Sequence, residues 1–238
     1  ISQFKDYDKY YMIGGSASWA NIRSLVTYNI KGMSLVEMED FDRPRVDVWG
    51  ISDLDLFREA NYVLRESKNS KKSIFTIIQT AGNHRPYTIP NDNEGFKIES
   101  IEKGVLKSAG FKSIEQFNAI RLLDHSIGQF FKMASESSYF DNTVFVLFGD
   151  HGTADPKAEH MRADDYELKL RSYNVPLIIY APKILGSLEE ITAASGLADL
   201  MPTIAGICRI PYLNKTMGRD IFKSKNNLAF IVNKKMSP

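Results

Sequence analysis

The sequence predicts an α/β domain in which a doubly wound, mostly parallel sheet is flanked by helices. Three short apolar runs carry this prediction, and each ends in a polar or turn segment: Ser73–Gln79, Thr143–Phe148 and Val175–Tyr180. Nearly continuous runs rich in β-branched and aromatic residues are typical of parallel strands buried on both faces. Helical patterns lie between the first two runs and after the third, and this alternation is the order of a doubly wound sheet.

The longest predicted helix covers Ser113–Ser137, where apolar residues recur at three-to-four spacing. Ser113 is a suitable N-cap, because its hydroxyl can accept a hydrogen bond from the first turn. A second helix is predicted to start near Ser195 and to cover Leu197–Ile207, with Pro202 bending or restarting it.

The N-terminal part of the chain has weaker patterns. The Gly14-Gly15-Ser16 segment predicts a turn at a strand end, and Asn21–Tyr28 predicts a short helix. Residues Asn91–Lys112 are expected to form an excursion over the substrate side of the sheet. Because no linker or repeat divides the 238 residues, we expect 1–238 to be a single domain.

The overall charge excludes some partners. With 30 basic and 29 acidic side chains, the formal net charge is +1, so no nucleic-acid partner is expected and any anion must be held by a local site. Cys208 is the only cysteine, which excludes an internal disulfide, and its apolar surroundings predict a buried core residue. The apolar runs are far shorter than the roughly 20 residues of a membrane-spanning helix.

The segment Gly149-Asp150-His151-Gly152 directly follows an apolar run. In a doubly wound sheet, ligands bind outside the carboxyl ends of the strands. A carboxylate and an imidazole next to each other in a tight turn can face one cation. The alternative is a turn in which Asp150 caps a helix and His151 is incidental. The spacing alone leaves both interpretations open.

Two further histidines are candidates. His84 lies just after the first apolar run and is followed by a Pro-Tyr pair, which suits a hydrogen-bond donor to an anion or leaving group. Its alternative is a loop histidine satisfied by backbone. His160 follows His151 by nine residues and is a candidate metal ligand or phosphate contact, with a solvated loop residue as the alternative.

Several motifs together resemble the sulfatase family, in its branch of lipoteichoic acid synthases and phosphoglycerol transferases. An apolar run with Gly-Asp-His-Gly, preceded by Thr-x-x-Asn-His-x-Pro-Tyr, is the main similarity. Other stretches agree in the order of the family: Gly14–Asn21, Trp49–Asp53, Val175–Pro182, Ala198–Thr203 and Gly218-Arg219.

The resemblance implies an alkaline-phosphatase-like fold and a divalent cation, manganese foremost, with magnesium, calcium or zinc as alternatives. It also implies that Asp150 and His151 are metal ligands and that His84 contacts the phosphate of the substrate. Trp19 and Arg23, and His160 with them, are expected to bind substrate. Their segment departs from the family pattern, because a glycine stands at the acidic position and the spacing differs, which puts phosphoglycerol specificity in doubt.

The family nucleophile is expected upstream of the Gly14 segment, and nothing between Ile1 and Tyr11 matches it. We therefore expect this chain to correspond to the C-terminal half to two-thirds of a catalytic domain and to be inactive by itself. The resemblance further implies an extracytoplasmic domain at the cell membrane, with a membrane tether upstream.

The function implied by the resemblance is a metal-dependent phosphoglycerol-type transferase, or a hydrolase of sulfuric or phosphoric esters. Its substrate would be an anionic lipid or glycan that carries a phosphate or sulfate ester. Two alternatives remain: an enzyme that only hydrolyses, as a strict sulfatase or phosphodiesterase, and a non-catalytic binding domain that keeps the fold.

Overall fold

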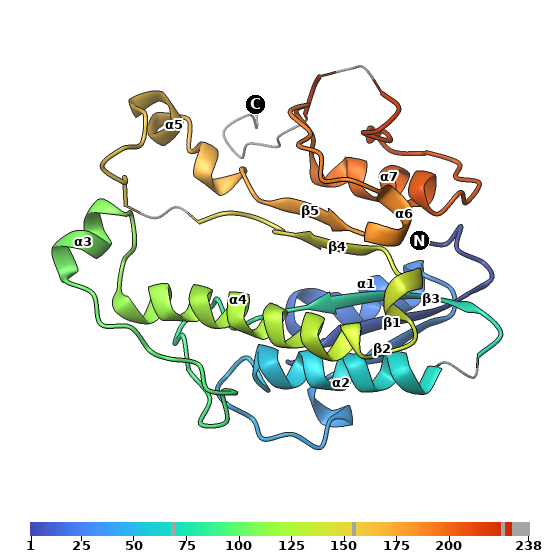
Figure 1. The fold of residues 1–238 in the computed structure, drawn as a ribbon, viewed down its shortest axis with the longest axis horizontal. Coiled ribbons are helices and arrows are strands. Elements are labelled where there is room, and N and C mark those ends of the chain that lie inside the picture. The colour runs from blue at the N-terminus through green and yellow to red at the C-terminus, as the bar shows by residue number, and fades with distance from the viewer. Residues whose placement is uncertain (68–69, 154–155, 225–226, 230–238) are drawn as a thin grey trace.

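The computed structural model describes residues 1–67, 70–153, 156–224 and 227–229, which are coloured in Figure 1. Their strands are β1 (Tyr7–Ile13), β2 (Met33–Val36), β3 (Ser73–Gln79), β4 (Phe145–Phe148) and β5 (Leu177–Tyr180). Their α-helices are α1 (Ile22–Asn29), α2 (Asp53–Glu66), α3 (Lys103–Ser108), α4 (Ile114–Ser135), α5 (Ala163–Glu167), α6 (Pro182–Leu185) and α7 (Leu200–Ile207).

The first three strands form a parallel sheet in the order β2-β1-β3. Side chains of β1 alternate between its two faces, as strand geometry requires. Tyr10 and Met12 pack against the helices α2 and α4, whereas Tyr11 and Ile13 pack on the side of α1. Helices on both faces of a parallel sheet confirm the predicted α/β fold class.

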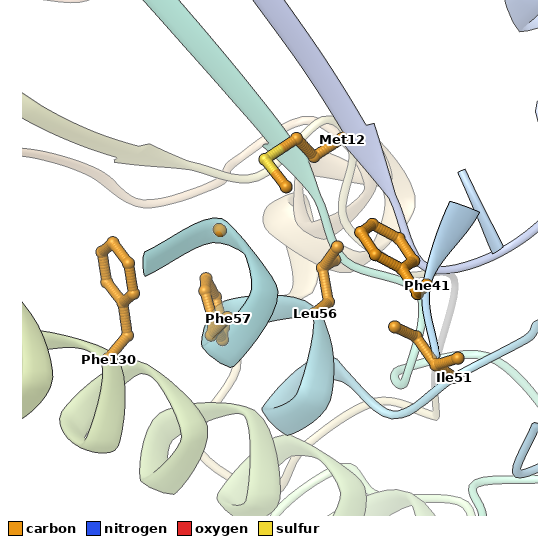
Figure 2. Close-up of a cluster of buried hydrophobic side chains, with 7 residues drawn as sticks. Met12, Phe41, Ile51, Leu56, Phe57 and Phe130 are labelled. Carbon is orange, nitrogen blue, oxygen red and sulfur yellow. The ribbon is translucent and has the colours of Figure 1, made fainter. Parts of the chain in front are cut away.

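The larger core joins this sheet to α2 and α4, which lie side by side (Figure 1). Met12 of β1 is fully buried and faces Leu56 and Phe57 of α2, while Phe130 reaches Phe57 from α4 at a ring separation of 5.2 Å (Figure 2). Burial of each such side chain contributes about 1.5–3 kcal/mol, so this core holds α2 against the sheet.

Both long helices begin at serine caps. The Ser52 hydroxyl accepts a hydrogen bond from the Asp55 N–H at 3.0 Å, and the Ser113 hydroxyl accepts one from the Gln116 N–H at 3.2 Å. Each cap satisfies an N–H group that the helix itself leaves unpaired. The predicted long helix and its N-cap are confirmed, with the helix covering Ile114–Ser135.

The expectation of parallel, fully buried strands is wrong for the second and third apolar runs. Strands β4 and β5 are antiparallel, with Phe145 opposite Tyr180, and they form a separate two-stranded sheet. Phe148 and Ile178 are 46% and 55% exposed. An antiparallel pair needs no crossover helix, and the described chain between these strands holds only the short α5 and a 3₁₀ turn at Leu170–Ser172.

The remaining predicted elements hold with shifted boundaries. The short N-terminal helix α1 begins at Ile22, and the C-terminal helix is split into a 3₁₀ turn, Leu197–Asp199, and α7. Pro202 lies in the first turn of α7, where a missing N–H costs least. Cys208 is only partly buried at the end of α7, against the expectation of a core residue, and this burial raises the pKa of its thiol.

Candidate functional site

The loop after β3 folds tightly around His84. The His84 N–H donates to the carbonyl of Ala81 at 3.1 Å, and His84 Nδ1 lies 3.2 Å from the same oxygen. The next peptide bond but one, Arg85–Pro86, is cis, and Tyr87 has a φ of 64°. The contact of Nδ1 with the Ala81 carbonyl holds the imidazole close to its own backbone, and His84 is only partly exposed.

Two tryptophans from distant parts of the sequence lie against this imidazole. The Trp49 ring packs on the His84 ring with a centroid separation of 4.2 Å and an interplanar angle of 34°. Trp19 stands edge-on to both, at 5.7 Å from Trp49 and 6.5 Å from His84, and is 52% exposed. The structure thus brings Trp19 to His84 and adds Trp49, for which the sequence motifs suggested no role.

A buried carboxylate holds the start of the same loop. Asp53, at the start of α2, is 7% exposed, and its two oxygens accept hydrogen bonds from the N–H groups of Ala81 at 2.9 Å and Gly82 at 3.0 Å. Burial raises the pKa of Asp53, and these two hydrogen bonds together with His84 oppose that effect. A Cβ atom on Gly82 would lie 2.6 Å from Asp53 Oδ2, so glycine is required for this approach.

The turn after β1 packs backbone to backbone against the Trp49 segment. The Ile51 N–H donates to the Gly14 carbonyl at 2.9 Å, and Gly50 has a φ of 108°. A Cβ atom on Gly15 would lie 2.5 Å from the carbonyl oxygen of Trp49. The position that is acidic in the family pattern therefore has no room for a side chain here.

Arg23 projects from α1 and forms an ion pair with Glu37. The other oxygen of this buried carboxylate accepts a hydrogen bond from the Ala17 N–H at 2.8 Å, which fixes its direction. The Arg23 side chain remains 52% exposed. Within the described residues, no hydrogen bond or ring contact joins it to Trp19 or His84, so the structure does not bring these residues into direct contact.

The Asp150–His151 turn follows β4 and is open to solvent. The side chains are 77% and 65% exposed. His151 Nδ1 lies 2.8 Å from the Gly152 carbonyl oxygen, and His151 Nε2 lies 3.8 Å from Asp150 Oδ2. The Gly152 N–H donates to the carbonyl of Ser172 at 3.0 Å, which anchors the turn to the segment before β5.

The chemistry of this pair fits two positions of a cation site. When Nδ1–H donates to a carbonyl, the lone pair of Nε2 is left for a metal ion, a common arrangement of metal-binding histidines. Bond lengths of about 2.0–2.2 Å place two ligands of one cation about 3–4 Å apart, in agreement with the separation of Asp150 Oδ2 and His151 Nε2. Among residues that the structure describes, no group of three or more His, Cys, Asp or Glu side chains gathers into a complete metal site.

The carboxyl ends of the strands meet near this turn. The Tyr11 hydroxyl of β1 donates to Gln79 Oε1 at the end of β3. Burial raises the pKa of Tyr11, and the negative charge of Asp150 raises it further, so Asp150 lies within electrostatic range of these strand ends. His84 also follows the end of β3, at the edge where parallel α/β sheets bind ligands, whereas the Asp150–His151 turn follows β4 of the second sheet.

His160 lies exposed in the loop that follows the Asp150–His151 turn. The loop is attached at Glu159, whose N–H donates to the carbonyl of Ser108, the last residue of α3, at 2.7 Å. In the described parts of the chain, no hydrogen bond, ion pair or ring contact links His160 to Asp150, His151 or the rings of His84, Trp19 and Trp49. The same parts contain no helix long and apolar enough to span a membrane.

Two curated relatives are much longer proteins than this chain. It is 26% identical over 190 residues to lipoteichoic acid synthase 1 of Bacillus subtilis (strain 168), which covers 75% of this chain and 27% of the synthase. It is 28% identical over 147 residues to an arylsulfatase of Clostridium perfringens (strain 13 / Type A), which covers 57% of this chain and 29% of the arylsulfatase. The chain thus spans less than a third of either relative.

Solved structures show the same fold. The lipoteichoic acid synthase LtaP from Listeria monocytogenes superposes with a TM-score of 0.75 at 22% identity, over 93% of this chain and 55% of that one. An alkaline phosphatase superfamily protein from Vibrio parahaemolyticus gives 0.74 at 23% identity, over 93% and 49%. These superpositions establish an alkaline-phosphatase-like fold. Since the sulfatase family model matches residues 2–210, the chain belongs to the sulfatase family.

Proposed function

We propose that the protein carrying this chain is a metal-dependent enzyme that transfers or hydrolyses phosphate or sulfate esters, with phosphoglycerol-type transfer as the first candidate. The observation that carries the proposal is the pair of donor atoms Asp150 Oδ2 and His151 Nε2, 3.8 Å apart beyond β4 in a chain of the sulfatase family. Similarity to lipoteichoic acid synthase 1 supports the transferase reading.

In this proposal Asp150 supplies an anionic ligand and His151 a neutral one. The Gly152 carbonyl fixes the His151 ring, because it accepts the proton of Nδ1 and leaves Nε2 as the ligand atom. Manganese is the first candidate cation, with magnesium, calcium and zinc as alternatives. When bound, the cation would neutralise charge on the transferring group and lower the pKa of an oxygen nucleophile.

His84 is proposed to donate a hydrogen bond to a non-bridging or leaving oxygen of the ester. In the tautomer whose Nδ1–H donates to Ala81, Nε2 carries a proton only when the imidazole is cationic. A cationic donor gives a charge-assisted hydrogen bond, which strengthens as negative charge grows on the oxygens. His84 therefore acts in the proposal mainly on the transition state.

The substrate is proposed to be an anionic lipid or glycan that carries the ester. The exposed Trp19 ring beside His84 suits the apolar face of a polyol or sugar, and the half-exposed guanidinium of Arg23 suits an anionic group. His160 is retained as an outer substrate contact. The family resemblance supports a site of action outside the cytoplasm, at the cell membrane.

Sulfate ester hydrolysis is the second candidate. It is favoured by the similarity to the Clostridium perfringens arylsulfatase and by the lack of space at Gly15 for the acidic residue expected of a phosphoglycerol site. A comparison of substrates separates the two candidates.

The test uses the full-length protein, stripped of metal and then supplied with manganese. Cleavage of an aryl sulfate, an aryl phosphodiester and a lipid with a phosphoglycerol headgroup is measured with and without the cation. We expect cation-dependent cleavage of the phosphoglycerol lipid. Preference for the aryl sulfate would select the second candidate, and cation binding with no cleavage of any ester would identify a binding domain instead. Turnover that ignores the cation would contradict both enzyme proposals.

A further inference from the structure

The segment Trp49–Asp53 contacts the His84 loop at two points, one before the histidine and one after it. Before it, Asp53 accepts the N–H groups of Ala81 and Gly82. After it, the indole Nε1–H of Trp49 donates to the Arg85 carbonyl at 2.6 Å. His84 lies between these attachments, and its ring rests on the Trp49 ring.

The Asp53 attachment is strong because each side satisfies the other. A buried carboxylate is costly unless it is hydrogen-bonded, and so is a buried backbone N–H. The first turn of α2 further favours a negative charge at this position. A small cavity of ≈ 20 Å³ borders Asp53, Gly82 and Trp49, and hydrogen bonds from Ala81 and Gly82 to Asp53 join the two segments beside it.

The Trp49 attachment is fixed in turn by its own backbone. The Trp49 N–H donates to Asp47 Oδ1 at 2.7 Å, and the following residue, Gly50, lies against Gly14 of the turn after β1. The indole thus stands on a rigid turn and can define where the His84 ring lies. Aromatic stacking at this distance adds to the stabilisation that comes from the buried area itself.

We propose that Asp53 and Trp49 are positioning residues that hold the His84 imidazole in the geometry needed for donation to the transferring group. The inference rests on the proposed function, because it presumes that His84 donates a hydrogen bond to the transferring group. It gives the Trp49–Asp53 segment a role in that donation. Neither residue touches the substrate. Asp53 sets the path of the loop, and Trp49 sets the plane of the imidazole.

Loss of this positioning lowers turnover more than substrate binding. A shift of about 1 Å in a group that acts on the transition state costs on the order of 100-fold in rate. Ground-state binding changes less, because the His84 hydrogen bond gains most of its strength as charge develops on the ester oxygens.

The experiment compares Asp53→Asn with Asp55→Asn in the full-length protein. Both carboxylates are buried in the first turn of α2, and Asp55 bonds to Ser52 and Arg58 instead of the His84 loop. We expect Asp53→Asn to lower kcat by about tenfold to 100-fold, with KM within about twofold of wild type. Asp55→Asn should lower the melting temperature while the folded protein keeps wild-type kcat.

Trp49→Phe is the second variant, and it keeps a ring beside His84 while it removes the hydrogen bond to Arg85. It should lower kcat by less than Asp53→Asn, and it provides the comparison if Asp53→Asn does not fold. Wild-type kcat in the folded Asp53→Asn protein, or an equal loss in Asp55→Asn, would overturn the inference.

An NMR measurement separates this inference from the proposed function. The imidazole signals of His84 are followed among the four histidines of the chain. We expect them to shift or broaden in Asp53→Asn and Trp49→Phe but not in Asp55→Asn. Unchanged His84 signals in both variants overturn the positioning role. Wild-type turnover in His84→Ala instead rejects the proposed role of His84 and leaves the NMR result to decide the contact.

Discussion

The two candidate motifs differ sharply in how the fold supports them. The His84 loop is bonded to a buried carboxylate, packed against two indoles and attached again after the histidine. In the Asp150–His151 turn, both side chains project into solvent, and their hydrogen bonds end within the turn itself at Gly152 and His151. The surrounding protein therefore fixes the position of His84, whereas the side chains of Asp150 and His151 are exposed to solvent.

This difference agrees with the two separate roles proposed for the motifs, hydrogen-bond donation by His84 and cation binding by Asp150 and His151. A donor that acts on a transition state must be fixed before the reaction, because its reorganisation would otherwise add to the barrier. A metal ligand can be ordered by the cation itself, since binding energy offsets the loss of side-chain freedom. We therefore expect substitutions in the His84 loop to change turnover, and substitutions in the Asp150–His151 turn to change cation binding.

The largest expected effect is on turnover in His84→Ala. Loss of one such donor costs about 100- to 1,000-fold in kcat. The melting temperature and the cation content should stay close to wild type, because the metal pair follows a different strand. If His84 is only a structural loop residue, stability falls by about 1–3 kcal/mol and the folded protein keeps its turnover. Kinetics and thermal melting on one preparation decide between these outcomes.

The next effect concerns cation binding by the open turn. A divalent cation at about 100 times its Kd should stabilise the folded protein by ~2.7 kcal/mol, since it binds the native state. Asp150→Ala removes an anionic ligand and should abolish both this stabilisation and the bound metal. Melting curves with and without manganese, together with elemental analysis, check this. Full metal occupancy in the variant would exclude Asp150 as a ligand.

A smaller effect is expected where Gly82 approaches Asp53. An added Cβ would lie 2.6 Å from a carboxylate oxygen, so Gly82→Ala should cost about 1–3 kcal/mol of stability. Gly104→Ala is the matched control, because Gly104 lies in α3 with no atom near its added Cβ, and the change should be neutral or slightly stabilising. Urea unfolding measures both, and equal stability of the two variants would contradict the close approach.

The smallest effect is on the pH dependence of stability. The pKa of Asp53 is raised by burial above its unfolded value, so its contribution to the free energy of unfolding is complete below about pH 4 and decreases as pH rises through the folded-state pKa. The difference in unfolding free energy between wild type and Asp53→Asn should therefore fall as the pH rises above about 4. If the difference in unfolding free energy between the two proteins instead grows with pH, the pKa of Asp53 is lowered in the folded state, and the prediction is wrong.

Sequence patterns predicted α1, α4, α7 and β3, because helical spacing and serine caps are local signals. They did not mark α2, which holds much of the core, or the short helices α3, α5 and α6. They did not mark β1, which has the charged residues Asp8 and Lys9 among its first positions. Nor could they give the direction of β5, since an apolar run of four residues is the same read in either orientation. Strand direction depends on the path of the connection, which is a tertiary property.

For the site, the sequence motifs named His84, Trp19 and the Asp150–His151 pair. The part played by Asp53 could not be predicted, because an acid directly after a serine N-cap is common in first turns and suggests only helix capping. Its real partners lie 28 and 29 residues further along the chain. The ion pair between Arg23 and Glu37 could not be predicted either, because Glu37 follows β2 and is distant from Arg23 in the sequence.

The contact between Gly15 and the Trp49 carbonyl limits how this protein can change its specificity. A carboxylate cannot be introduced at position 15 by one substitution, because its Cβ would meet backbone 2.5 Å away and Gly50 is locked against Gly14 behind it. Redesign toward an acidic headgroup contact must rebuild the 47–51 turn together with position 15. That turn also supports the His84 ring through Trp49. Under the proposed function, substrate choice and catalytic geometry are therefore linked, and we expect substitutions that change the specificity at position 15 to impair turnover as well.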